Sequence, residues 1–163
     1  MTAITPSHGR ADARERFDEI DPAVPVGYWV ERFGADPQDF NDYSFFQRNP
    51  RLIWIARRGL EIPACLDLEA IGMGFLRTGM PYPKPTSHAA IIFGGLARKN
   101  VVHLDDEDAR RFLSRERFPY PEDEIDSPGF VLARNRGLQL GCGLWLEGHL
   151  SSLVPRRWDL KVL

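Results

Sequence analysis

The side chains that could perform nucleophilic, acid–base or metal chemistry are scattered along this chain of 163 residues. Cys65 and Cys142 could act as nucleophiles, but neither lies in a Cys-x-x-Cys pair or beside a histidine at ligand spacing. The histidines form no pair with the spacing of zinc ligands; they are His8, His88, His103 and His149. We therefore expect no catalytic residue, no metal site and no cofactor, and two reduced, structural cysteines.

Two other patterns have a structural interpretation as well as a chemical one. The acidic run from Asp105 to Asp108 could bind a metal or serve as an acid–base cluster. Acidic residues also favour the positive N-terminus of a helix, and Asp105 has the side chain of an N-cap. The Gly-x-Gly fragments at Gly72 and Gly141 lie in strand-like sequence and match no phosphate-binding loop. We expect capping and strand curvature from these residues.

Positive charge is concentrated in two segments. Residues 77–104 carry four basic and no acidic side chains, whereas residues 105–128 carry four basic and nine acidic ones. Residues 129–163 carry five basic and two acidic side chains. Arginine binds phosphate oxygens bidentately, and an aromatic ring beside arginines can stack on an unpaired base. We expect RNA contacts from Arg77, Lys84, Arg98, Lys99, Arg134, Arg136, Arg156, Arg157 and Trp158. The alternative is an unevenly charged, solvated surface on which Trp158 anchors the C-terminal segment.

The elements that must position these residues are clearest between Gly129 and Pro155. Apolar runs separated by Asn135-Arg136-Gly137 and by Glu147-Gly148 predict a three-stranded meander. From Leu138 to Leu146, leucines and Cys142 alternate with glycines and Trp145, which predicts a buried leucine face opposite the glycines. Glycine within a strand is typical of curvature or of a close backbone approach, so we expect a small curled β-barrel.

The first half reads as mixed α/β structure. Residues 1–24 are polar, with one short helix expected over residues 11–20, and we expect this segment to be flexible. A helix over residues 28–33 should end at Gly34. The Pro-rich stretch from Met80 to Pro85 predicts a stiff connector. Further expected elements are strands at 52–56, 64–68, 69–76 and 101–104, a helix capped by Thr86 or Ser87 that runs to about Ala97, and a helix after Asp105.

The predicted fold class is therefore α+β, with a flexible segment (1–24), a small mixed α/β domain (25–98) and a β-barrel domain (99–163). The first 21 residues contain no apolar run typical of a signal peptide, and no stretch of about 20 apolar residues could cross a bilayer. We expect a cytoplasmic protein.

Several of these motifs resemble the C-terminal region of Sun-type RNA 5-methylcytosine methyltransferases, which consists of a pre-PUA domain and a PUA domain. The resemblance covers about half of the chain and rests on Lys84-Pro85-Thr86, Asn100-Val101-Val102, Asp105 to Asp108, Gly129 to Ala133, Gly137 to Gly143 and Pro155-Arg156-Arg157. Residues 26–83 resemble the pre-PUA part only in size, position and mixed α/β character. The catalytic domain of these enzymes has no counterpart in the sequence. The two-domain layout is also similar to that of Nip-seven-type ribosome biogenesis factors.

The resemblance implies a non-catalytic RNA-binding module that stands alone and recognises structured RNA, tRNA or rRNA. Its expected partners are this RNA and a separate RNA-modifying enzyme or a ribosomal particle, without DNA or a membrane. The alternative is a small-molecule or modified-base binding protein, or an enzyme, built on a PUA-like barrel. A concave pocket lined by titratable groups would favour that alternative. A weaker alternative is a protein–protein adaptor that uses the acidic loop at 119–128.

Overall fold

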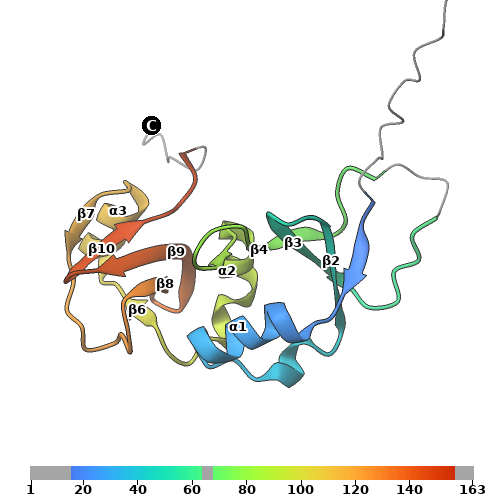
Figure 1. Ribbon diagram of the computed structural model, residues 1–163. Helices are drawn as coiled ribbons and strands as arrows, with labels where there is room; N and C mark the ends of the chain where they lie inside the picture. The colour runs from blue at the N-terminus through green and yellow to red at the C-terminus, as the bar shows by residue number, and fades with distance from the viewer. Residues whose placement is uncertain (1–15, 64–67, 157–163) are drawn as a thin grey trace, which may run out of the picture.

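The computed structural model describes residues 16–63 and 68–156. Its strands form two five-stranded sheets, with the orders β1-β2-β3-β4-β5 and β6-β8-β9-β10-β7 (Figure 1). The strands are β1 (Asp18–Ile20), β2 (Tyr43–Asn49), β3 (Leu52–Arg57), β4 (Met73–Arg77), β5 (Lys84–Pro85), β6 (Val101–His103), β7 (Arg117–Pro119), β8 (Gly129–Asn135), β9 (Leu138–Leu146) and β10 (His149–Ser152). The helices are α1 (Ala23–Phe33), α2 (Ser87–Phe93) and α3 (Asp106–Leu113), with short 3-10 turns η1 (Pro37–Phe40) and η2 (Gly94–Leu96). The predicted α+β class is confirmed.

The N-terminal end of the described chain is more ordered than we expected. Residues 1–15 lie outside the described residues, as does part of the helix expected over 11–20. Within the described part, Asp18–Ile20 is a strand that pairs with β2, so the expected helix is wrong there. Helix α1 already begins at Ala23, within the segment that we expected to be flexible. Strand β1 is held by its pairing with β2, which lies about 25 residues further along the chain. Local sequence patterns do not reveal such a distant partner.

The predicted helix caps at Gly34, Thr86 and Asp105 are confirmed, because local side-chain chemistry sets them. Gly34 ends α1 in the left-handed conformation, with a φ of 64°. The hydroxyl of Thr86 accepts a hydrogen bond from the backbone N–H of Ala89 and thereby caps α2. The carboxylate of Asp105 does the same for α3.

Other expected ends are wrong, since α1 begins at Ala23 rather than at residue 28 and the strand expected over 69–76 is β4, at Met73–Arg77. Helix α2 is shorter than expected, since it ends at Phe93 and η2 completes the segment. Most of the strand expected at 64–68 lies outside the described residues.

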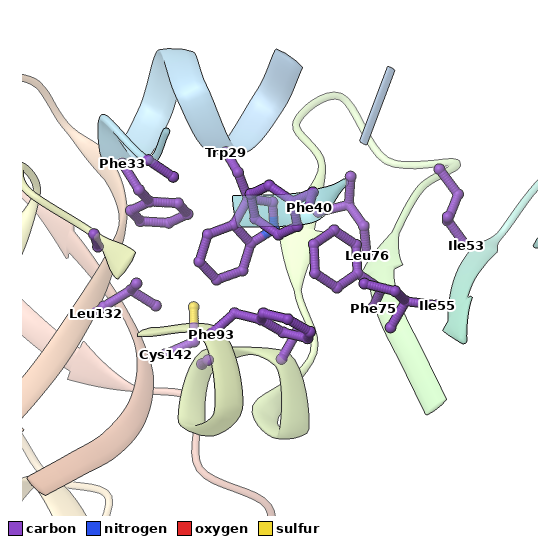
Figure 2. Close-up of a cluster of buried hydrophobic side chains, with 14 of the residues drawn as sticks. Trp29, Phe33, Phe40, Ile53, Ile55, Phe75, Leu76, Phe93, Leu132 and Cys142 are labelled. Carbon is purple, nitrogen blue, oxygen red and sulfur yellow. The ribbon is translucent and has the colours of Figure 1, made fainter. Parts of the chain in front are cut away.

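One hydrophobic core joins the two sheets. Figure 2 shows Trp29 and Phe33 of α1 on one side of this core and Phe93 of α2 on the other. Residues from β8 and β9, Leu132 and Cys142, belong to the same buried cluster as side chains of the first sheet. In Figure 1, α2 lies between the sheets and α1 runs along their lower side. The strands divide the chain between Pro85 and Val101, but the shared core spans this division, and the domain boundary at residue 98 stays a prediction.

The second sheet is built on the predicted meander. Strands β8, β9 and β10 are consecutive and antiparallel, while β6 joins them as a parallel partner of β8. The turn residues Arg136-Gly137 and Glu147-Gly148 all have positive φ, between 48° and 81°. Two such residues in succession form the type I′ turn, whose twist suits a two-residue hairpin. At the other edge β7, which the sequence analysis missed, pairs with β10.

The predicted buried face of β9 is wrong. Leu138 and Leu146 are 68% and 47% exposed, whereas Trp145, on the glycine face, is buried. The interior of the curled second sheet is lined by this glycine face and contains Trp145, Phe112 and Leu150. The leucine face is divided, since Leu140 packs partly against this interior whereas Cys142 belongs to the core shared with α1 and α2. Both faces of β9 are therefore covered along its middle, and alternation alone could not tell which face lines the barrel.

The two edge strands of the second sheet are linked through the acidic loop after β7. The hydroxyl of Tyr120 donates to the carboxylate of Glu124 over 2.6 Å and contacts the carbonyl of His103, in β6, at 3.4 Å. Glu124 also accepts the backbone N–H of His103 at 2.8 Å and contacts its ring at 2.7 Å. Burial raises the pKa of the Glu124 carboxyl, but these hydrogen bonds outweigh burial and hold it below its usual value. The loop therefore helps to close the barrel.

Candidate nucleic-acid interface

Two of the predicted RNA-binding residues come together on the first sheet. Arg77 at the end of β4 and Lys84 at the start of β5 are cross-strand partners. Both line a cavity of about 180 Å³, which is also lined by Thr86, His88 and Pro155. Pro155 brings the C-terminal end of the described chain to this place, with the exposed Arg156 following directly. We call this site the basic cavity.

Five of the predicted RNA-binding cations have no acidic partner in the described chain. Within residues 16–63 and 68–156, no ion pair or side-chain hydrogen bond engages Arg77, Lys84, Arg98, Lys99 or Arg156. Residues 77–104 contain no acidic side chain that could neutralise them locally. Unneutralised cations give a surface positive potential, which attracts polyanions.

A larger cavity of about 630 Å³ lies between α1, the Pro-rich connector that leads into the first sheet, and strands β8 and β9 of the second sheet. Its lining includes Tyr82 and Pro83 from the Pro-rich connector, Lys99 from the segment before β6, and Phe130, Leu144 and Leu146 from β8 and β9. We call this site the inter-sheet cavity. The connector links the two cavities, since Tyr82 and Pro83 line one of them and the next residue, Lys84, lines the other.

Hydrogen bonds from Arg32 hold the floor of the inter-sheet cavity. The Arg32 guanidinium donates to the carbonyl of Phe130 at 2.7 Å, and to the hydroxyl and carbonyl of Ser127 at 2.7 and 3.0 Å. Asn100, 2% exposed, donates to the carbonyl of Arg32 at 2.7 Å and accepts the N–H of Asp126 at 3.1 Å. This network ties α1 to the loop before β8, so the lining is held in place without a ligand.

Arg98 and Lys99 follow η2 and are held through their backbone. Their N–H groups donate to the carbonyl of Phe33 at 2.8 and 3.1 Å, beside the end of α1. The Arg98 side chain is exposed and that of Lys99 is half-buried at the rim of the inter-sheet cavity. The fold therefore leaves both cations without an acidic partner among the described residues while it fixes their main chain.

Arg134 and Arg136, in contrast, are engaged by the protein itself. The Arg134 guanidinium donates to the carbonyls of Gly94 and Ala97, the latter at 3.0 Å, and to the side-chain oxygen of Gln139 at 3.1 Å. It thus satisfies carbonyls at the end of the α2–η2 segment, which makes it a structural residue rather than a free phosphate ligand. Arg136, at the tip of the β8–β9 turn, pairs with Asp106 of α3 and is 76% exposed. Arg157 and Trp158 lie outside the described residues.

The structure contains functional candidates that the sequence analysis missed. Tyr82 is 77% exposed although it is a large aromatic residue. Its position between two prolines was a usable signal, because prolines stiffen the backbone that presents it. Arg32 and Asn100 gave no such signal, since their roles depend on contacts with residues about 26 to 98 positions away.

The groups considered for catalysis have structural roles where they are described. Cys142 is buried, and burial raises the pKa of its thiol to about 12, so it is not ionised near neutral pH. This confirms the structural interpretation of Cys142, while Cys65 lies outside the described residues. In residues 16–63 and 68–156, no three His, Cys, Asp or Glu side chains are grouped so that they could hold a metal ion. None of the described helices is long and apolar enough to cross a membrane.

Comparison with known proteins finds a similar family for each half of the chain. Residues 99–159 match the family model of the methyltransferase RsmF PUA domain. Residues 10–72 match the model of a family of unknown function, DUF7122. The chain is also 28% identical over 113 residues to the ribosomal RNA small subunit methyltransferase F of Aeromonas salmonicida (strain A449). This match covers 69% of the chain but 23% of the relative, so the chain spans about a quarter of the length of that protein.

The sequence resemblance to the PUA region of RNA methyltransferases is thereby confirmed for residues 99–159. The matched model is that of the PUA part of such an enzyme. The pre-PUA interpretation of the first half stays a prediction, because the family matched by residues 10–72 has no assigned function.

Proposed function

We propose that this chain is a non-catalytic RNA-binding protein that recognises structured RNA, tRNA or rRNA, through the surface around the basic cavity. The observation that carries the proposal is the convergence of Arg77, Lys84 and the segment that leads into Arg156 on one small cavity. These cations come from distant parts of the sequence and lack acidic partners in the described chain. The similarity of residues 99–159 to the PUA domain of a methyltransferase supports the same conclusion.

The proposed protein works in the cytoplasm beside a partner, either a separate RNA-modifying enzyme or a ribosomal particle. Its RNA contacts are Arg77, Lys84, Arg98, Lys99, Arg156 and Arg157, with Trp158 and the exposed Arg136 at the margin of the set. Arg134 contributes by holding the η2 segment that precedes Arg98. Such a surface binds through phosphates, so base-specific readout requires further contacts.

A second candidate function is the binding of a small molecule or a modified base. The observation that favours it is the inter-sheet cavity, whose volume of about 630 Å³ is in the range of small-molecule sites. Titratable side chains line it, among them Glu31, Arg32, Lys99 and Asp126. This site and the basic cavity adjoin the same connector, so both candidates can be tested with one set of variants.

Salt-dependent RNA binding tests the first candidate. The affinities of the parent protein for a tRNA transcript and for a small-subunit rRNA fragment should fall steeply as salt rises, because phosphate contacts release counterions. Replacing Arg77 and Lys84 together with glutamine should weaken binding and reduce the salt slope by up to about two units, roughly one per lost phosphate contact. The double change Arg156→Ala and Arg157→Ala should have a similar effect.

A matched control removes the same charge elsewhere. Arg58, after β3, and Arg110, in α3, are exposed and belong to neither cavity described above. Replacing both with glutamine should leave the salt slope close to that of the parent. Thermal melting of all variants checks that they fold. If the Arg77/Lys84 and Arg156/Arg157 variants both keep the parental slope, the basic cavity is not the RNA-binding surface.

A further inference from the structure

We propose that the inter-sheet cavity receives one unpaired, unstacked base of the RNA whose phosphates bind at the basic cavity. This inference rests on the proposed RNA-binding function and adds to it a base-binding pocket at the junction of the two sheets. The pocket lies outside the barrel interior, which is filled by Trp145, Phe112 and Leu150.

The volume and lining of the cavity suit a nucleobase. A base has two apolar faces and a polar edge, and proteins commonly hold it by stacking on aromatic rings. The inter-sheet cavity offers Tyr82 and Phe130 as aromatic walls and Leu144 as an apolar surface. Lys99 adds a positive charge without an acidic partner in the described chain. The volume of about 630 Å³ leaves room for the base and for part of its sugar.

The backbone on both sides of the cavity is restrained. Pro81 and Pro83 flank Tyr82 and restrict the backbone that carries its ring. On the opposite wall, Arg32 and the buried Asn100 fix the loop that leads to Phe130. Asn100 is the only buried polar residue among the described residues, and it adopts a positive φ of 53°. A lining held in advance reduces the entropy lost when a ligand is ordered.

Continuity with the basic cavity favours a base within RNA over a free small molecule. Two residues span at most about 7 Å, so Tyr82 lies within that distance of Lys84 along the backbone. A strand with one phosphate at Lys84 and Arg77 can therefore place an adjacent base against Tyr82. The charges also fit this division, because Arg77 and Lys84 at the basic cavity have no acidic partner within residues 16–63 and 68–156. In the inter-sheet cavity, Glu31 and Asp126 lie among the lining with Arg32 and Lys99, so this site suits a base better than a phosphate.

The test separates stacking from phosphate contacts. Tyr82→Ala should weaken binding of an RNA hairpin with a mixed-sequence loop about 5- to 150-fold, the range expected for the loss of one stacked base. The salt slope should stay unchanged, because no phosphate contact is lost. Tyr82→Phe should bind like the parent. Met80→Ala is the matched control, since Met80 is an exposed apolar residue of the same connector that does not line the cavity.

A second RNA identifies the occupant. On the same hairpin with abasic loop nucleotides, Tyr82→Ala should bind as tightly as the parent, because no base remains to stack. Free nucleoside monophosphates should bind far more weakly than the hairpin. Tyr82-dependent binding of a free nucleotide as tight as that of the hairpin would overturn the proposal in favour of a small-molecule site.

The remaining outcomes distinguish this inference from the function on which it rests. If the parent binds the hairpin with a salt slope that depends on Arg77 and Lys84, but Tyr82→Ala binds equally well, the base pocket is wrong and the RNA-binding surface stands. If no RNA binds in a salt-dependent manner, both the proposed function and the base pocket are wrong.

Discussion

Replacing Gly143 with valine should destabilise the fold, because the centre of the barrel leaves no room for a side chain there. A Cβ atom at this position would lie 3.0 Å from Cδ1 of Leu150, 3.0 Å from Cε2 of Phe112 and 3.2 Å from the carbonyl oxygen of Ser151. Leu150 and Phe112 are themselves fully buried. Gly143 pairs with β8 on one side and β10 on the other, so β9 cannot shift away without breaking backbone hydrogen bonds.

The magnitude follows from two opposing effects. Adding carbon atoms to a packed core costs about 1–3 kcal/mol. Replacing a glycine also makes the unfolded chain less flexible, which raises the free energy of unfolding by about 0.4–1 kcal/mol. The net loss for alanine is therefore roughly 0–2.6 kcal/mol. Valine adds two more methyl groups among the same neighbours, so its loss should exceed about 1 kcal/mol.

Urea denaturation of the parent and of the Gly143→Val and Gly143→Ala variants measures this loss as a lower midpoint at a similar slope. Gly27→Ala is the matched control, since Gly27 lies within α1 and a Cβ there meets no atom within 4 Å. At position 27 the change from glycine to alanine should stabilise the protein by about 0.5–1 kcal/mol, because alanine favours the helix. A Gly143→Val variant with the parental midpoint would refute the close-approach explanation for this glycine.

Two further predictions concern the contacts that hold the second sheet and its junction with α2. The pKa of the Glu124 carboxyl is lowered in the folded protein, so this residue should stabilise the fold above pH 4.5, its ordinary pKa, and lose this effect as the pH falls through the folded pKa. In urea titrations, the difference in stability between the parent and Glu124→Gln should be large at neutral pH and small at acidic pH. A difference that does not change with pH would contradict this prediction. Arg134→Ala should lower the free energy of unfolding by about 1–3 kcal/mol, because it leaves backbone carbonyls of the α2–η2 segment without a donor. Arg136→Ala, at an exposed ion pair, should leave the denaturation midpoint nearly unchanged, and equal midpoints for the two arginine variants would show that Arg134 is not structural.

The parts of the fold that the sequence predicted are those determined by neighbours in the chain. The cap residues Thr86 and Asp105 act on the next three residues, and Gly34 needs only its own left-handed backbone. Strands β1 and β7 were missed because each is three residues long and depends on a distant partner. The leucine face of β9 was misassigned for a related reason, since a second core formed by α1 and α2 covers its centre.

The sequence predicted which segments of the candidate site are positively charged, but not where their side chains lie. Counting charges located the basic segments, yet Arg134 and Lys99, which belong to those segments, have different environments. Arg134 donates to carbonyls of the α2–η2 segment, whereas the Lys99 side chain has no acidic partner within the described residues. Sequence alone also could not show that Pro155 lines the same cavity as Lys84, because this arrangement depends on how the chain after the meander returns to the first sheet.

The connector between the two cavities explains how one short segment can serve both proposed contacts. Its C-terminal end is anchored, since Thr86 donates to the carbonyl of Gly74 at 2.6 Å and caps α2 through Ala89 at 3.1 Å. Pro85 pairs with β4, which fixes Lys84 opposite Arg77. With that end held and Pro83 restricting the backbone, the separation between the backbone positions of Lys84 and Tyr82 changes little. A phosphate bound at one end of the connector would therefore set where the neighbouring base can lie, which a flexible loop with the same side chains could not do.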